Sequence, residues 1–151
     1  MPGNMQKFPE RLNHGNHNEE VCDYLEVKKD KFADWIITTA FYSALQFVSY
    51  RIFPFEAPRT EGKKTLINTI DEYCNYKETI TGNKPKKHAL LADLVFEKCS
   101  DISPDYDWLL SMSMNARYTE YQHVPEVGNK SRMLMKKIKA FCTRKEPNYL
   151  K

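Results

Sequence analysis

The stretch that decides the fold class is WIITTAFYSALQFVSY, residues 35–50. Its apolar side chains recur every three or four positions, which is the spacing of a helix and not of a strand. Trp35 and Phe47 add apolar surface on other sides of this helix. We therefore expect neighbouring elements to contact it from several directions, at the centre of the core. The periodic positions are Ile37, Ala40, Phe41, Ala44, Leu45, Val48 and Ile52.

The rest of the chain also shows helical spacing, and it predicts an all-α fold without strands. Asn16 and Glu19 have the spacing of a capping box, so the first helix is expected over residues 17–29. Ser103 before Pro104 predicts another helix start, because serine caps helices and proline fits the first helical position. Pro125 disfavours helical geometry at the residue before it, so this helix should end near residues 121–123.

These elements predict one antiparallel bundle of about five helices. Pro54 ends the central helix, and residues 55–64 are expected to form a loop. The other helices are expected around residues 66–74, 90–98 and 127–142, with the question open whether the first two are separate helices or one irregular helix. The predicted organisation is a loose lead-in over residues 1–16, a helical domain over residues 17–142 and a basic tail over residues 143–151.

Composition excludes several classes of protein. The net charge of +3 is too small to mark a nucleic-acid binder by itself, although residues 129–151 hold eight basic residues and one acidic residue. The four cysteines lie far apart, so we expect reduced thiols and neither a zinc site nor a redox motif. The longest uncharged run has 16 residues and contains polar ones, which is too short for a membrane span. A cytoplasmic location, with no membrane contact, is the expectation.

Motifs of common enzymes are absent. With 5 glycines, the chain has no glycine-rich phosphate loop and no nucleophile elbow. We expect no cofactor. His14 and His17 have a separation that suits a metal, but two histidines in an asparagine-rich segment make a poor site, so no metal is expected either.

The strongest motif is Arg117 followed, after five intervening residues, by His123. In its position late in a helical chain, this spacing resembles the signature of the HEPN superfamily. The segment from Asp34 to Leu45 is similar to the aromatic second helix of many HEPN proteins, and His88 falls where some members carry histidine. The resemblance covers roughly residues 17–142.

The HEPN resemblance implies a homodimer in which the arginine and histidine of both copies line one cleft. In active members that cleft cuts RNA without metal, in toxin or defence systems. Arg117 is then the expected phosphate clamp and His123 the expected general acid or base, which suits a guanidinium and an imidazole. Tyr121 lies four residues after Arg117 on the same helix face and is expected to assist.

Other observations favour a protein that cuts nothing. On an ideal helix His123 is turned by about 600° and displaced by roughly 9 Å from Arg117, so the two are not simple neighbours. Tyr118 stands where the active pattern has a polar residue, and Arg117 with Glu120 has the spacing of an ordinary surface ion pair. The alternative is a non-catalytic dimerisation or binding module, for example the partner of a nucleotidyltransferase-like protein or of an antitoxin.

Cations on the expected last helix form a second candidate site. Arg132, Lys136 and Lys139 share a face opposite the apolar one. They are the predicted RNA-binding residues, since such a face can follow a phosphate backbone. The competing interpretation is that an amphipathic surface helix needs a polar face for solvation.

Overall fold

The computed structural model describes residues 6–119, 122 and 125–145, and these are mostly helical. The all-α class is therefore confirmed, although this part of the chain holds six α-helices and a small hairpin. Short 3₁₀ turns cover Glu26–Lys28, Thr60–Gly62 and Ser100–Ile102. In chain order the elements are α1 (Pro9–Leu25), α2 (Lys29–Ile52), β1 (Phe55–Pro58), β2 (Lys64–Ile67), α3 (Ile70–Thr81), α4 (Lys87–Lys98), α5 (Ser103–Tyr118) and α6 (Pro125–Thr143).

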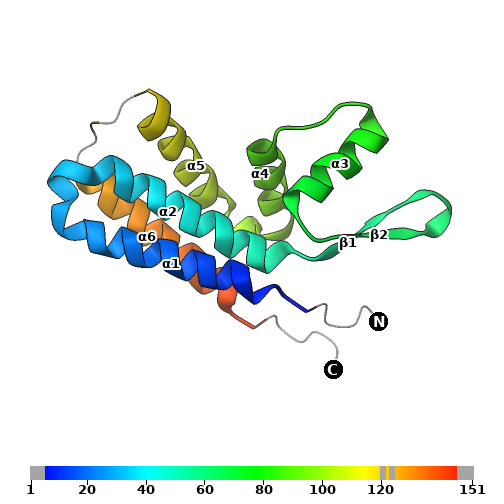
Figure 1. Ribbon diagram of the computed structural model, residues 1–151, viewed down its shortest axis with the longest axis horizontal. Helices are drawn as coiled ribbons and strands as arrows, with labels where there is room; N and C mark the ends of the chain where they lie inside the picture. The colour runs from blue at the N-terminus through cyan, green and yellow to red at the C-terminus, as the bar shows by residue number, and fades with distance from the viewer. Residues whose placement is uncertain (1–5, 120–121, 123–124, 146–151) are drawn as a thin grey trace.

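Helix α2 is the centre of the core, as its spacing predicts. It packs against α1, α4, α5 and α6 (Figure 1). Ile37, Ala40, Phe41, Ala44, Phe47 and Val48 are completely buried. Trp35 is the exception, because 56% of it is exposed, and the expectation that it adds to the packed surface of α2 is wrong.

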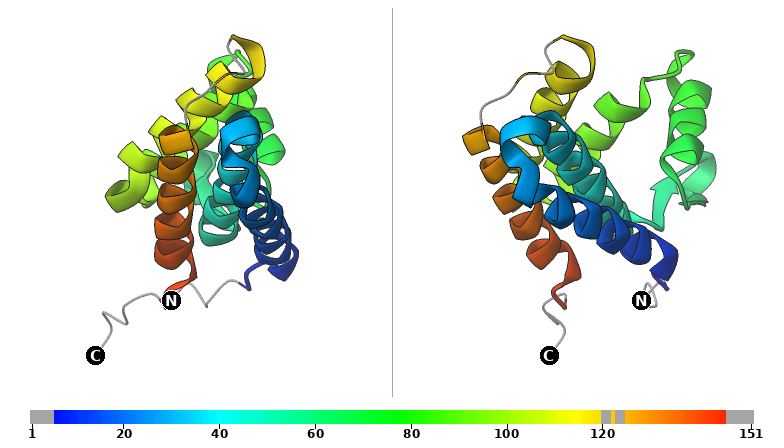
Figure 2. Two further views of the ribbon diagram at one scale, coloured as in Figure 1. Left: turned by 90° about the vertical axis from the view of Figure 1, so that its left-hand side faces the viewer. Right: turned by 60° about the vertical axis from the view of Figure 1, so that its left-hand side comes forward.

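Helices α1, α2 and α6 lie side by side along the long axis of the molecule (Figures 1 and 2). Helix α1 runs opposite to α2, as a short connection requires. Helix α6 begins at the end of the bundle where α2 also begins, and it runs in the same direction as α2. The predicted antiparallel order holds for α1 against α2 and, roughly, for α5 against α6, but not for α2 and α6, because α3, α4 and α5 carry the chain back before α6 begins.

Helix α1 begins at Pro9, well before the expected start. Asn16 and Glu19 lie inside the helix and do not cap it, so the predicted capping box is wrong. The early turns are held by α2: Gly15 is buried against Phe47, and the Ser43 hydroxyl donates a hydrogen bond of 2.7 Å to the Gly15 carbonyl. Tertiary packing stabilises a segment whose own helix propensity is poor.

A two-stranded antiparallel hairpin replaces the expected loop after α2. Phe55 pairs with Ile67 and Pro58 pairs with Lys64, so residues 66 and 67, expected to be helical, lie in β2. Helix α3 begins only after Thr69. The Thr69 hydroxyl accepts a hydrogen bond of 3.0 Å from the amide of Glu72, whose carboxylate accepts one from the amide of Asn68. This paired cap sets the start of α3.

Helix α5 begins at the predicted place but ends earlier than expected. Ser103 is its first residue and is buried, and its side chain does not cap the helix. The helix ends at Tyr118, and α6 begins at Pro125. Of the three residues expected to form the catalytic site, Arg117 lies in the last turn of α5. Tyr121 and His123 lie outside the described residues.

Candidate active site

Arg117 is half-buried and is held in place by its own helix and by α2. Its Nε donates a hydrogen bond of 3.2 Å to the carbonyl of Ser113, and Nη2 contacts the Met114 sulfur at 3.3 Å. Its Nη1 donates to the Tyr42 hydroxyl of α2. Among the described residues, none of these three partners is a carboxylate. Glu120, the expected ion-pair partner, lies outside the described residues.

His88 lies near Arg117, on the first turn of α4. Its ring packs edge-on against Phe41, with 5.7 Å between the ring centroids. The guanidinium carbon of Arg117 lies 5.9 Å from the centroid of the same Phe41 ring. Burial, and then the positive charges of Arg117 and Lys87, lower the pKa of His88 below its ordinary value of 6.5. The imidazole is therefore neutral at pH 7 and able to accept a proton.

Aromatic rings surround the arginine. Its guanidinium carbon lies 5.1 Å from the ring of Tyr42 and 5.2 Å from the ring of Tyr118, both distances of cation–π contacts. Phe41 is completely buried beneath the site, whereas 73% of Tyr118 is exposed. The result is a cation fixed on an aromatic base, with a neutral histidine beside it and an exposed ring at its edge.

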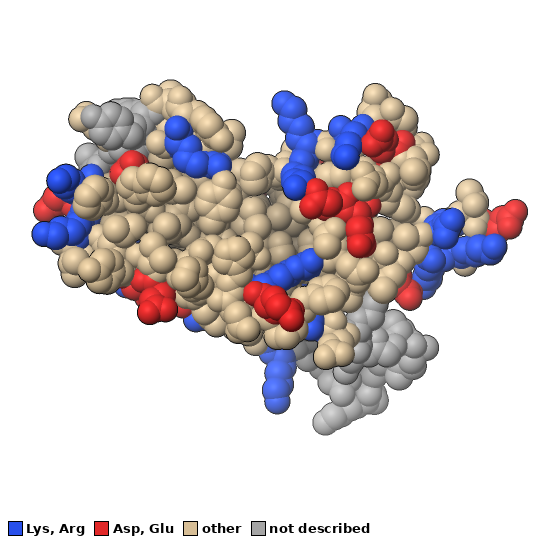
Figure 3. Space-filling model, viewed as in Figure 1, with Lys and Arg blue, Asp and Glu red and all other residues tan. Residues whose placement is uncertain are grey.

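The approach to His88 is basic. Lys84, Lys86 and Lys87 precede it in the turn into α4, all three are exposed, and no acidic residue occurs between residues 82 and 92. Lys87 forms an ion pair of 2.7 Å with Asp71 of α3. Figure 3 shows blue side chains on both sides of a notch in this face, near α5 and near α4, with red side chains next to those near α4. The run of lysines before His88 attracts anions.

Sequence reasoning pointed to Arg117 but assigned no role to the cluster around it. The structure joins Tyr42 of α2, His88 of α4 and Arg117 of α5, which are far apart in the chain. The signal that was open to sequence reasoning is the run from Lys84 to His88, in which three lysines precede a histidine without any carboxylate. Basic runs of this kind favour phosphate-bearing partners.

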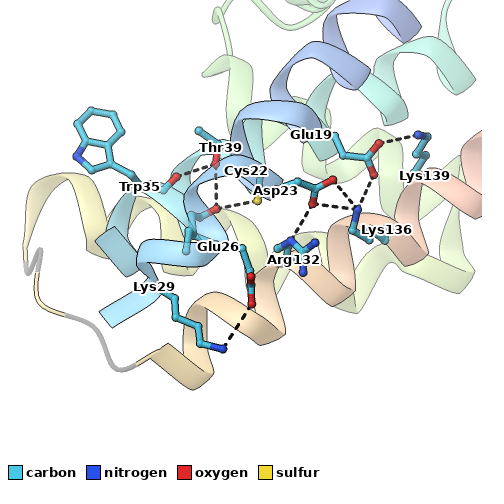
Figure 4. A network of polar contacts seen from close by, with 11 residues as sticks. Glu19, Cys22, Asp23, Glu26, Lys29, Trp35, Thr39, Arg132, Lys136 and Lys139 are labelled. Atoms are coloured by element: carbon cyan, nitrogen blue, oxygen red, sulfur yellow. Dashed lines mark hydrogen bonds and ion pairs between the residues drawn. The ribbon is translucent and has the colours of Figure 1, made fainter. Parts of the chain in front are cut away.

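The three predicted RNA-binding cations of α6 face α1, where they form a network with two carboxylates (Figure 4). Arg132 contacts Asp23 at 2.8 Å, and Lys139 contacts Glu19 at 2.6 Å. Lys136 contacts both carboxylates, at 3.2 Å and 3.1 Å. Their charge is thus balanced in large part by α1, and they link the two helices. Their predicted contact with RNA stays a prediction.

We expect Asp23→Asn to lower the free energy of unfolding by about 1 kcal/mol at pH 7, a value reduced for the partial exposure of these groups. Burial raises the pKa of Asp23, but its hydrogen bonds with Lys136 and Arg132 outweigh burial, and the net pKa is lowered. The stabilisation is therefore complete above the ordinary pKa of 3.8 and is lost as the pH falls through the lowered pKa.

Urea unfolding of Asp23→Asn and of the wild type at several pH values measures this difference. The neighbouring exposed carboxylate Glu20 supplies a control with the same change of charge, Glu20→Gln. Equal losses in both variants would mean that net charge, and not the α1–α6 network, accounts for the effect.

The described residues contain no group of three or more histidine, cysteine, aspartate or glutamate side chains placed to hold a metal ion. His14 and His17 lie exposed on α1. No helix in the described part of the chain is long and apolar enough to cross a membrane.

Comparisons with protein-family models, with curated proteins and with solved structures found no match to this chain. The HEPN resemblance therefore rests on the sequence motifs alone.

Proposed function

We propose that this chain is a metal-independent endoribonuclease whose site is centred on Arg117 and His88. The observation that carries the proposal is their arrangement: Arg117 and His88 both contact the ring of Phe41, and the charge of Arg117 helps to lower the pKa of His88. RNA provides its own nucleophile, the 2′-hydroxyl, so a protein needs only a cation for the phosphate and groups that transfer protons. Both kinds of group are present here.

The proposed reaction uses each group once. His88 accepts the proton of the 2′-hydroxyl while that oxygen attacks the neighbouring phosphorus. Arg117 holds the non-bridging phosphate oxygens and stabilises the charge that gathers on them. The bond from phosphorus to the 5′-oxygen breaks, and an acid gives that oxygen a proton. The products are a 2′,3′-cyclic phosphate and a free 5′-hydroxyl.

His123 is the expected acid, and Tyr121 is expected to assist it. Both roles rest on the sequence spacing and on the HEPN resemblance. The same resemblance implies a homodimer in which the site residues of both copies line one cleft. Multi-angle light scattering of the purified chain tests the homodimer. A monomer that cleaves RNA would contradict the shared cleft while leaving the roles of Arg117 and His88 intact.

The test of the proposed function is RNA cleavage in the presence of EDTA. The purified chain should cut single-stranded RNA and leave cyclic phosphate ends, which acid treatment or mass spectrometry of the products identifies. The same oligonucleotide with 2′-O-methyl riboses should remain whole, because its nucleophile is blocked. Cleavage of the methylated strand, or cleavage that requires added metal, would contradict the proposal.

A second candidate function is that of a non-catalytic module that binds a partner protein, such as a nucleotidyltransferase-like protein or an antitoxin. The observation that favours it is that the guanidinium of Arg117 is engaged by the Ser113 carbonyl, the Tyr42 hydroxyl and the Met114 sulfur, which ties α5 to α2. If Arg117 serves only structure, Arg117→Gln lowers stability, and the wild type binds and cuts no RNA.

A further inference from the structure

Tyr118 is an exposed aromatic residue at the edge of the candidate site. Its ring is 73% exposed, yet it lies 5.2 Å from the guanidinium carbon of Arg117. Among the tyrosines of the described residues, Tyr24 of α1 offers a contrast: it is 80% exposed, and it has no cation–π contact with a described residue. The exposure of Tyr118 therefore coincides with the point at which a phosphate would bind.

Resting on the proposed function, we propose that Tyr118 is a stacking platform for the base next to the phosphate held by Arg117, so that the site selects unpaired RNA. A base and its phosphate are joined by one ribose, which brings the base within reach of the neighbouring ring. Bases in a duplex have both faces covered and cannot stack on a protein side chain. An exposed ring beside a phosphate clamp is the usual way to recognise single strands.

The arrangement also separates two contributions to binding. Arg117 contributes through charge, which salt screens, whereas Tyr118 contributes through ring contact, which salt hardly affects. Tyr42 is only half exposed and is already engaged by its hydroxyl with Arg117, so it serves to position the guanidinium. Tyr118 is the ring left available to a ligand.

The probe is a fluorescent 2′-O-methyl oligoribonucleotide of about 12 nucleotides, which cannot be cleaved, alone or annealed to its complement. Fluorescence anisotropy in EDTA measures its binding to the full chain at several salt concentrations. We expect Tyr118→Ala to weaken binding of the single strand about 5- to 100-fold, and Tyr118→Trp to retain the affinity. Binding of the duplex should change little. Tyr24→Ala is the matched control and should bind like the wild type.

Salt dependence distinguishes stacking from an indirect effect on the clamp. Tyr118→Ala should leave the slope of log affinity against log salt concentration unchanged. Arg117→Gln should reduce the magnitude of this slope by about 1, because one phosphate contact is lost. A reduced slope in Tyr118→Ala would show that Tyr118 acts through Arg117 and would overturn the stacking proposal.

Two other outcomes separate this proposal from the proposed function. If Tyr118→Ala binds the single strand as tightly as the wild type, and the wild type still cuts RNA, stacking is wrong and the ribonuclease proposal stands. If the wild type neither binds the single strand nor cuts RNA, both proposals are wrong. Circular dichroism of Tyr118→Ala should match the wild type, because the side chain lies at the surface.

Discussion

We expect His88→Ala to lower the rate of RNA cleavage by about 10²- to 10⁴-fold, the usual contribution of a positioned proton-transfer group. The 2′-hydroxyl is a weak nucleophile until its proton is removed. His88 is neutral because burial and the charges of Arg117 and Lys87 lower its pKa. Single-turnover cleavage of a labelled RNA in EDTA measures the loss, and circular dichroism checks that the variant is folded.

The pH profile gives a sharper readout than the loss alone. A general base acts in its neutral form, so the rate should fall as the pH drops through the lowered pKa of His88, which places the acidic limb below pH 6.5. Removal of one neighbouring positive charge in Arg117→Gln should raise the pKa of His88 and move the limb toward 6.5. A limb that stays in place in this variant would show that a different group titrates.

Comparison among histidines assigns the roles. His14 is exposed on α1, an element that contributes no residue to the candidate site, so His14→Ala should cut RNA like the wild type. His123→Ala should lose activity if His123 is the acid that the sequence spacing predicts. Full activity in His88→Ala together with its loss in His123→Ala would overturn the role of His88 and leave a metal-independent ribonuclease whose site rests on Arg117 and His123.

The central helix could be predicted from sequence because burial and periodicity coincide there. Phe41, Phe47 and Val48 are buried on α2 as their helical spacing requires. The all-α class follows from the same kind of signal in α4 and α6. Periodicity says which side of a helix is apolar, but it says nothing about the direction in which α6 runs along α2.

The first half of α1 and the hairpin after α2 were missed because their stability comes from the rest of the chain. The first turns of α1 contain His14, Gly15 and Asn16, which are poor helix formers, and contact with α2 overrides that preference. The hairpin after α2 has strands of four residues each, too short for a clear alternation of apolar and polar positions. Its Leu66 and Ile67 also fit a helical pattern.

The candidate site shows the same limit. Arg117 was identified by a motif within one segment, and a motif needs no knowledge of packing. Its contacts with Tyr42 and its proximity to His88 depend on how α4 and α5 lie against α2, and no local pattern contains that information. The same holds for α6. Its sequence does not show that its cations form ion pairs with Glu19 and Asp23 of α1.

We expect Phe47→Ala to lower the free energy of unfolding by about 3 to 5 kcal/mol, as for other large buried rings. Phe47 is completely buried where α1 crosses α2. A loss of this size is a large share of the stability of a domain, which is roughly 5 to 15 kcal/mol. Urea unfolding followed by circular dichroism measures it. Phe96 of α4 is 72% exposed, and Phe96→Ala should change stability by less than about 0.5 kcal/mol.

Substitution of Gly15 tests whether the stability lost in Phe47→Ala comes from the contact between α1 and α2. A β-carbon at position 15 would lie 2.6 Å from the Phe47 ring, so Gly15→Ala should destabilise by about 1 to 3 kcal/mol despite the better helix propensity of alanine. Once Phe47→Ala has removed the ring, the added methyl has space, and Gly15→Ala should cost nothing or even stabilise. The two losses should therefore fail to add, as expected for residues in contact. Additive losses, or a Gly15→Ala variant that is more stable than the wild type, would mean that α1 does not approach α2 through this glycine.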